Sequence, residues 1–187
     1  MMKSSSYIKI DTIIELHLLT EQDAVAMYQL IEHNRSYLRE WLPWVDFTQS
    51  AEDERAFISN TRTLYRDNQS STYAIWYQKQ IVGTVGYNQL DWPNRKVDIG
   101  YWLAAQYQGK GIMTRSCSAL IEYAFNDLKF NKVEILCATM NARSCAIPQR
   151  LGFTYEGTMR QVEWLYDHFV DLKLYGLLES EWRQRRL

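Results

Sequence analysis

The chain has 187 residues, a length typical of one domain with a substantial hydrophobic core. Its formal net charge of −1 excludes a general electrostatic attraction to nucleic acids or anionic membranes. It has no apolar run of transmembrane length, no secretory signal pattern and no metal-type cysteine spacing. We therefore expect a single cytoplasmic domain over residues 1–187, without a bound metal and with loose ends at 1–6 and 183–187.

The first third of the chain predicts short strands followed by helices. Residues 7–19 contain two runs in which apolar and polar residues alternate, the period of a strand. Thr20 and Asp23 are typical of a helix start, and Ser50 is typical of another. Between these two helices, residues 34–44 crowd Trp, Tyr and Leu around a proline. We expect a bent helical segment there, whose aromatic residues belong either to the core or to a ligand wall.

The remaining two thirds predict strands that alternate with two helices. The predicted strands cover residues 72–77, 81–90, 97–103, 133–138, 155–165 and 169–178, and the predicted helices cover 112–128 and 141–150. Neither a linker nor an internal repeat divides this order. It indicates one mixed α/β domain with a central sheet and helices on both of its faces.

A glycine-containing loop joins the strand 97–103 to the helix 112–128. Gly109 and Gly111 immediately precede the helix, and the apolar residues of that helix recur at helical spacing. The start of a helix presents unpaired N–H groups and the positive end of the helix dipole, and glycine lets a phosphate approach the backbone closely. The loop is therefore a candidate anion site, although a simple strand-to-helix connection has the same pattern.

The spacing Gln106-x-x-Gly109-x-Gly111 resembles the acetyl-CoA pyrophosphate loop of the GNAT N-acetyltransferases. Further segments resemble the RimJ/RimL-type protein N-terminal acetyltransferases, the YdaF-like ribosomal-protein acetyltransferases in particular. These segments are Arg35-x-Tyr37-Leu38-x-x-Trp41-Leu42-Pro43-Trp44, Ile99-Gly100-Tyr101-Trp102-Leu103, Asn141-x-x-Ser144, Leu151-Gly152-Phe153 and Glu156-Gly157.

The resemblance implies the GNAT fold and acetyl-CoA as the acyl donor. In that fold a twisted, mostly antiparallel sheet of about seven strands has a splayed parallel pair at its centre and helices on both faces. The strand before the loop is expected to bulge and open a cleft for the pantetheine arm. The implied donor-binding residues are Ile99, Tyr101, Leu103, Gln106, Gln108, Gly109, Lys110, Gly111, Ile112, Met113, Thr114 and Asn141. Lys110 and Arg115 could instead be solvated residues at the helix end.

Ser144 is the candidate general acid for the departing CoA thiolate, by resemblance. Both Asn141 and Ser144 also suit a plain capping role at the start of the helix 141–150. Cys145 is adjacent and raises the alternative of a covalent acyl-enzyme. The resemblance favours direct attack of the amine on the thioester, and no histidine is placed in sequence to activate Cys145.

Glu163 is the candidate general base, because it matches a carboxylate position of the RimL-type enzymes. Its alternative reading is an exposed glutamate of a strand. Asp98 is a second candidate base, and it lies on the face of its strand opposite to that of Val97 and Ile99. His168 is interpreted as a surface histidine of the final turn.

Three functions are compatible with these residues. The resemblance favours transfer of acetyl to a protein N-terminal α-amino group, with a ribosomal protein as acceptor and a homodimer as a plausible assembly. A small amine, such as an aminoglycoside, a polyamine or an amino acid, is the alternative acceptor, because one fold hosts many substrates. A non-catalytic acyl-CoA-binding module is a third reading, which the presence of both Ser144 and Glu163 disfavours.

Overall fold

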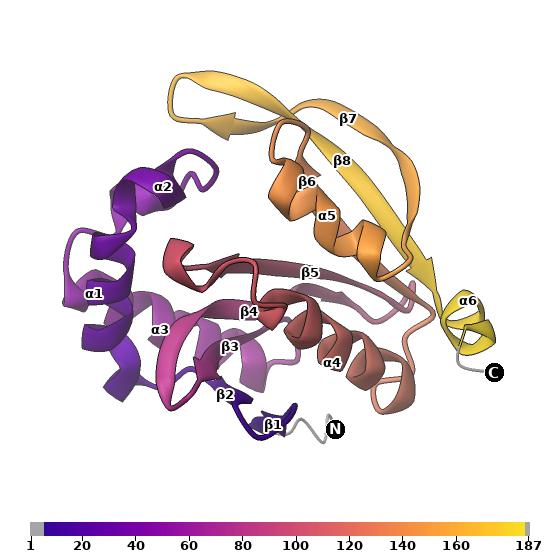
Figure 1. Ribbon diagram of the computed structural model, residues 1–187, viewed down its shortest axis with the longest axis horizontal. Coiled ribbons are helices and arrows are strands. Elements are labelled where there is room, and N and C mark those ends of the chain that lie inside the picture. The colour runs from indigo at the N-terminus through magenta and orange to yellow at the C-terminus, as the bar shows by residue number, and fades with distance from the viewer. Residues whose placement is uncertain (1–5, 186–187) are drawn as a thin grey trace.

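The structure, a computed structural model, describes residues 6–185 and contains one eight-stranded sheet with helices on both faces (Figure 1). The strands are β1 (Tyr7–Lys9), β2 (Ile14–Leu18), β3 (Ser71–Tyr77), β4 (Gln80–Asp91), β5 (Lys96–Leu103), β6 (Lys132–Ala138), β7 (Thr154–Leu165) and β8 (His168–Leu178). The α-helices are α1 (Ala24–His33), α2 (Arg35–Arg39), α3 (Ala51–Arg66), α4 (Ile112–Asn126), α5 (Ala142–Arg150) and α6 (Glu179–Gln184), and the 3-10 helices are η1 (Glu21–Asp23), η2 (Val45–Phe47) and η3 (Ala105–Tyr107).

The strand order is β1-β2-β3-β4-β5-β6-β8-β7. Every neighbouring pair is antiparallel except β5 and β6, which are parallel and lie near the middle of the sheet. The predicted mixed sheet with a central parallel pair is thereby confirmed. It has eight strands rather than about seven, because the two alternating runs in residues 7–19 pair with each other as separate strands.

The two sheet faces carry different helices, as the alternation of side chains along each strand requires. On one face, Tyr73, Val85 and Ile99 pack in the main core with the apolar residues of α4 and α5. On the other face, Ala74 and Trp102 pack against α1 and α3. None of the helices in the described range is long and apolar enough to cross a membrane.

The parallel pair separates partway along its length. β5 and β6 pair only from Lys96 to Asp98, opposite Lys132 to Glu134. Beyond this point β5 stays paired with β4, and β6 stays paired with β8. The bulge expected in the strand 97–103 lies instead in the neighbouring β4, at Asn88. There the Asn88 side chain occupies the space that a side chain at Gly100 would need.

The predicted helix starts are correct, and one helix was not predicted. Thr20 and Asp23 form a capping box, and the Ser50 hydroxyl accepts a hydrogen bond from the Asp53 amide. The expected loose end at 183–187 is wrong in part, because residues 183–184 belong to α6, whose backbone continues directly from β8. Residues 1–5 and 186–187 of the expected loose ends lie outside the described part of the chain.

One acidic side chain is buried on the inner face of α3. Glu54 is 3% exposed, and it shares that face with Ile58 and Thr61. Its Oε1 atom has no hydrogen-bond partner within the described chain. Burial raises the pKa of the Glu54 carboxyl to about 7 from its ordinary value of 4.5. Burying an ionised carboxylate without a partner is unfavourable, so the neutral form is favoured in the folded state.

Glu54 should therefore lower the stability of the fold as the pH rises. Above pH 4.5 the carboxyl ionises readily in the unfolded chain but resists ionisation in the folded one, so stability falls until the pH passes about 7. We expect the free energy of unfolding of Glu54→Gln, relative to the unsubstituted chain, to rise by about 3 kcal/mol between pH 4.5 and pH 8. Urea denaturation across this range measures the difference, and a constant difference would contradict the assignment.

Candidate active site

A cavity of about 1830 Å³ lies where β5 and β6 separate. It exceeds the range of roughly 300–1,000 Å³ that is usual for a single small ligand, so it has room for two reactants. We define its donor half by the residues of the α4 start, β6 and α5, with Tyr101. We define its acceptor half by three groups of lining residues. The first runs from α1 to α3, both helices included, the second comes from β3, β4, β7 and β8, and the third is Asp98, Gly100 and Trp102 of β5.

The donor half contains a row of unpaired backbone donors at the start of α4. Gly109 and Gly111 have φ angles of +72° and +71°, in the left-handed region that favours glycine. This conformation leaves the amides of residues 109–114 without a backbone or side-chain acceptor within the described chain. A Cβ added at Gly109 would meet nothing within 4 Å, so this stretch of backbone is open to a ligand. The arrangement suits a phosphate group.

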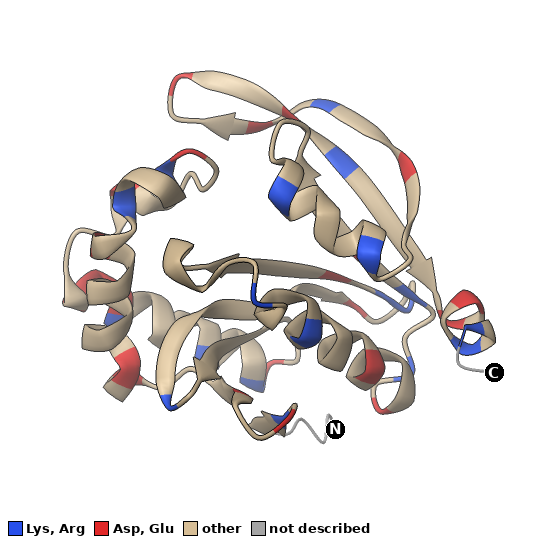
Figure 2. Ribbon diagram, viewed as in Figure 1, with Lys and Arg blue, Asp and Glu red and all other residues tan. Residues whose placement is uncertain are grey.

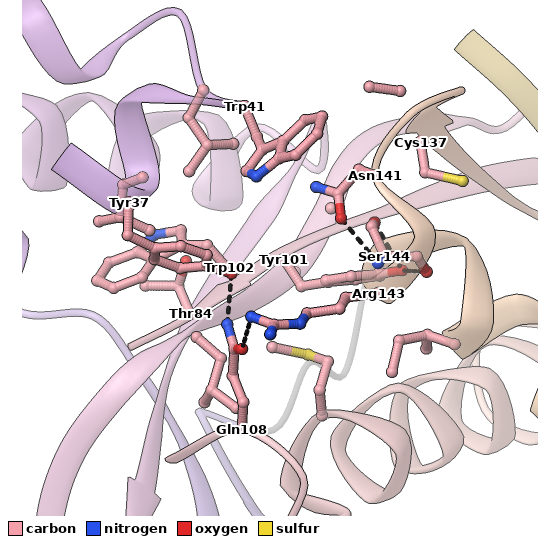
Figure 3. Close-up of a pocket in the computed structure, with 18 of the residues that line it drawn as sticks. Tyr37, Trp41, Thr84, Tyr101, Trp102, Gln108, Cys137, Asn141, Arg143 and Ser144 are labelled. Atoms are coloured by element: carbon pink, nitrogen blue, oxygen red, sulfur yellow. Dashed lines mark hydrogen bonds between the residues drawn. The ribbon is translucent and has the colours of Figure 1, made fainter. Parts of the chain in front are cut away.

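Three polar side chains connect the two halves at this loop (Figure 3). The Gln108 amide donates to the Tyr37 hydroxyl and accepts from Arg143 Nη1 at 2.7 Å. Arg143 and Arg150 are the basic residues of α5 (Figure 2). Both line the cavity. Arg143 thus places a positive charge beside the loop of unpaired amides.

The start of α5 brings Asn141 and Ser144 together with Tyr101 of β5 (Figure 3). The Asn141 Oδ1 atom accepts from the Ser144 amide at 3.0 Å, which is the predicted capping contact. The Tyr101 hydroxyl donates to the Ser144 carbonyl at 3.0 Å, and the Ser144 Oγ lies 3.4 Å from the Tyr101 hydroxyl. Burial raises the pKa of Tyr101 well above its ordinary value, so Tyr101 keeps its proton.

Two buried thiols come from β6 and α5, the elements on either side of Asn141 in the chain. The Sγ atoms of Cys137 and Cys145 are 2.8 Å apart, and both cysteines are free. Cys137 lines the cavity, whereas Cys145 does not. Burial raises the pKa of Cys137 strongly, which favours the unreactive thiol form. Cys117 is likewise free and buried.

The acceptor half is acidic and aromatic. Asp53, Glu54, Asp98 and Glu163 line it, together with aromatic side chains that include Trp102. All the arginines among the described lining residues lie in the donor half instead. Burial raises the pKa of Glu163 and also that of Asp98, although Asp98 accepts hydrogen bonds from Asn88 and from the amide of Gln89. A raised pKa brings a carboxyl closer to the range suited to a general base.

The structure brings most of the predicted site residues to this cavity. Its lining includes Tyr101, Leu103, Gln108, Gly109, Gly111, Ile112, Met113, Thr114, Asn141, Ser144 and Glu163.

Three predicted donor-binding residues, Ile99, Gln106 and Lys110, do not line the cavity. Ile99 is a core residue, Gln106 is exposed, and the Lys110 ammonium lies 5.1 Å from the centre of the Tyr107 ring. Arg115 does line the cavity but is paired with Asp11. His168 is exposed, as expected, and contacts Asp167.

Sequence reasoning missed Glu54 and Arg143. In the sequence, Glu54 follows Glu52 and Asp53 directly after Ser50, and all three are acids of the kind that the start of a helix favours. The signal that separates it is its spacing, since Glu54, Ile58 and Thr61 fall on one face of the helix. Arg143 lies inside the Asn141-x-x-Ser144 motif, at a position the motif leaves open.

Comparisons with known proteins agree with this geometry. The family model of the acetyltransferase (GNAT) domain matches residues 14–154. YdaF of Bacillus subtilis (strain 168), provisionally named a ribosomal N-acetyltransferase, is 37% identical over 93% of this chain and 96% of its own length. The ribosomal-protein-serine acetyltransferase of Escherichia coli (strain K12) is 32% identical over 93% of this chain and 98% of its own.

Solved structures show the same fold. RimL, described as a ribosomal L7/L12 α-N-protein acetyltransferase in complex with coenzyme A, superposes with a TM-score of 0.90 at 29% identity, covering 94% of this chain and 99% of that one. The microcin C7 self-immunity acetyltransferase MccE, in complex with acetyl-CoA and AMP, gives 0.89 at 30% identity, covering 94% and 97%. The loop of free amides, the separated strands and these similarities together establish that the chain belongs to the GNAT acetyltransferase family.

Proposed function

We propose that this protein transfers the acetyl group of acetyl-CoA to the N-terminal α-amino group of a protein, with a ribosomal protein as the acceptor. The observation that carries the proposal is the continuity of one cavity between an anion-binding donor half and an acidic acceptor half. The names of the relatives support the acceptor class, because YdaF is described as a ribosomal N-acetyltransferase and the Escherichia coli enzyme as a ribosomal-protein-serine acetyltransferase.

The residues of the donor half fit acetyl-CoA. The free amides of residues 109–114 and the guanidinium of Arg143 suit the pyrophosphate. The unpaired edges of β5 and β6 offer main-chain groups to the pantetheine arm, and Asn141 Nδ2 remains available beside them. The bound donor supplies an activated acetyl group, held as a thioester.

Ser144 and Glu163 can divide the proton transfers that acetylation needs. Glu163 lies on β7 within the acceptor half, and the raised pKa of its carboxyl suits removal of a proton from an incoming ammonium. Ser144 Oγ lies within the donor half and is held beside the Tyr101 hydroxyl, so it can deliver a proton to a leaving thiolate. Main-chain amides of the separated β5 can polarise a carbonyl oxygen.

The acceptor half suits a peptide terminus. Its carboxylates attract a positively charged amine, and its rim includes Phe47 and Phe57, which are 80% and 47% exposed. An apolar, exposed rim beside an acidic interior can contact the residues that follow an N-terminal amine. A small amine would leave this rim uncovered, so the rim favours a protein acceptor.

We also propose a homodimer in the cytoplasm. The β7–β8 hairpin exposes several large apolar side chains, and such surfaces are enriched at interfaces between subunits. These side chains are Tyr155, Met159, Val162, Trp164 and Phe169. The cytoplasmic assignment follows from the acceptor, because ribosomal proteins are made and assembled there.

Substitution of the two proton-transfer residues tests the proposed chemistry. We expect Ser144→Ala and Glu163→Gln each to lower kcat on the order of a hundredfold, the usual contribution of a general acid or base. Because the pKa of Glu163 is raised, kcat/KM of the unsubstituted enzyme should fall as the pH drops through that pKa. The Glu163→Gln variant should lose this acidic limb.

Thiol release from acetyl-CoA measures these rates with a panel of ribosomal N-terminal peptides, polyamines and aminoglycosides as acceptors. Full activity of both variants across the pH range would refute the two roles. Stimulation by the small amines alone would refute the acceptor class.

A charge placed in the amide loop tests the donor site. Gly109→Asp adds a carboxylate where the pyrophosphate binds, whereas Gly109→Asn adds a neutral side chain of the same shape that also tolerates a positive φ. We expect acetyl-CoA to bind the Asp variant at least about tenfold more weakly than the Asn variant, a difference of about 1.4 kcal/mol. Isothermal titration calorimetry measures both affinities, and equal affinities would place the pyrophosphate elsewhere.

A further inference from the structure

The tip of the β7–β8 hairpin extends toward α2 (Figure 1), and Tyr166 attaches it to the segment between α2 and η2. The Tyr166 hydroxyl donates to the Leu42 carbonyl, 124 residues earlier in the chain, at 2.6 Å. The guanidinium of Arg39 lies 4.0 Å from the centre of the Tyr166 ring, which is a cation–π distance. Arg39 also donates to both carboxylate oxygens of Asp46, at 2.8 and 2.9 Å, so its guanidinium is held in place beneath the ring.

The backbone conformation of Tyr166 is unfavourable for a tyrosine. Leu165 pairs with His168, so Tyr166 and Asp167 form a two-residue turn. Tyr166 has a φ of +60°, in the left-handed region where a side chain is strained and glycine is favoured. Such strain persists where the surrounding structure compensates for it, and it is often found at functional sites. The contacts of its side chain, rather than the needs of the turn, therefore account for a tyrosine at this position.

A bulge separates the tip from the rest of the hairpin. The pairing of β7 with β8 shifts register between Met159 and Glu163. In this irregular stretch the Asp171 carboxylate accepts from the Gln161 amide at 2.7 Å. Beyond it the strands pair regularly up to the turn, so Glu163 belongs to the tip. A bulge interrupts the ladder and bends the strand, so the tip needs an attachment of its own to keep a fixed position.

The tip presents Glu163 to the acceptor half. Glu163 and Leu165 lie on the same face of β7, because side chains alternate along a strand. Leu165 is 5% exposed, so the body of the protein covers this face, whereas Trp164 on the other face is 52% exposed. Glu163 and Leu42 both line the cavity, so Tyr166 connects two of its walls.

We propose that Tyr166 is a positioning residue for acetyl transfer: by attaching the hairpin tip to Leu42 and Arg39, it holds the Glu163 carboxyl inside the acceptor half. This inference rests on the proposed function, since it takes Glu163 as the general base. Tyr166 is not among the residues that line the cavity within the described chain, so it acts through Glu163 and does not touch either reactant.

The exposure of the Glu163 carboxyl links its position to its chemistry. Burial is the cause of the raised pKa of Glu163, so a tip that moved away from the cavity would expose the carboxyl and return its pKa toward 4.5. Burial also raises the pKa of the Tyr166 hydroxyl, so Tyr166 is neutral. The charged groups around the attachment are paired with each other, Arg39 with Asp46 and Asp167 with His168. Loss of the Tyr166 side chain therefore exposes Glu163 without removing a charge.

Replacement of Tyr166 by glycine tests this role, because glycine removes the attachment and suits the positive φ. We expect Tyr166→Gly to lower kcat at least about tenfold, since a misplaced base transfers a proton less efficiently. The KM for acetyl-CoA should stay unchanged, because the donor half keeps its contacts. The acidic limb of kcat/KM should move to lower pH. Thiol release with one ribosomal N-terminal peptide measures all variants, so that titration of the acceptor amine is common to them.

Two further variants separate the attachment from the turn. Tyr166→Phe keeps the ring beside Arg39 and loses only the hydrogen bond to Leu42, so its kcat should lie between those of Tyr166→Gly and the unsubstituted enzyme. Gln78→Gly is the matched control, because Gln78 is exposed, has a φ of +50° and occupies the first position of the two-residue turn between β3 and β4. It should keep the kcat and the pH profile of the unsubstituted enzyme.

NMR titration of the Glu163 carboxyl in the free protein tests the positioning without any acceptor. We expect a lower pKa of Glu163 in Tyr166→Gly than in the unsubstituted chain and in Gln78→Gly. Equal pKa values, or an unchanged kcat in Tyr166→Gly while Glu163→Gln is impaired, would overturn the inference. If Glu163→Gln keeps full activity although the pKa shift is observed, the proposed base fails instead, and the placement of Glu163 by Tyr166 stands.

Discussion

The separation of two parallel strands is the constraint on which the site depends. β5 and β6 form a ladder as far as Asp98 and Glu134, after which their facing edges have no common hydrogen bonds. Unpaired main-chain groups inside a sheet are unfavourable unless something else satisfies them. Pairing on the outer edges, with β4 and β8, holds both strands in place while the gap stays open. The gap therefore forms a preformed site in which the sheet supplies the walls.

Charge is distributed across this gap in a way that suits its two reactants. The donor half combines free amides with arginines, and the acceptor half has carboxylates with raised pKa values. An anionic donor and a cationic amine are thus each attracted to a different half. The acceptor half also reduces the stability of the fold, because the buried Glu54 carboxyl has an oxygen, Oε1, with no hydrogen-bond partner in the described part of the chain. Such a cost is common where a site is built for a ligand.

Much of the fold followed from local patterns, whereas the site followed only in part. The apolar periodicity of residues 112–128 and the caps at Thr20 and Ser50 depend on neighbours in sequence, which explains why they were predicted correctly. The contact of Tyr101 with Ser144 and the contact of Gln108 with Tyr37 join residues far apart in the chain. Those contacts depend on tertiary packing, which a single sequence does not reveal.

Amide hydrogen exchange, measured by NMR with and without acetyl-CoA, tests the central claim most directly. The claim is that the unpaired amides of residues 109–114 hold the donor. We expect these amides to exchange rapidly in the free protein, since they lack acceptors, and to become protected when acetyl-CoA is bound. Protection confined to other parts of the chain, with the amides of residues 109–114 still exchanging rapidly, would contradict the account.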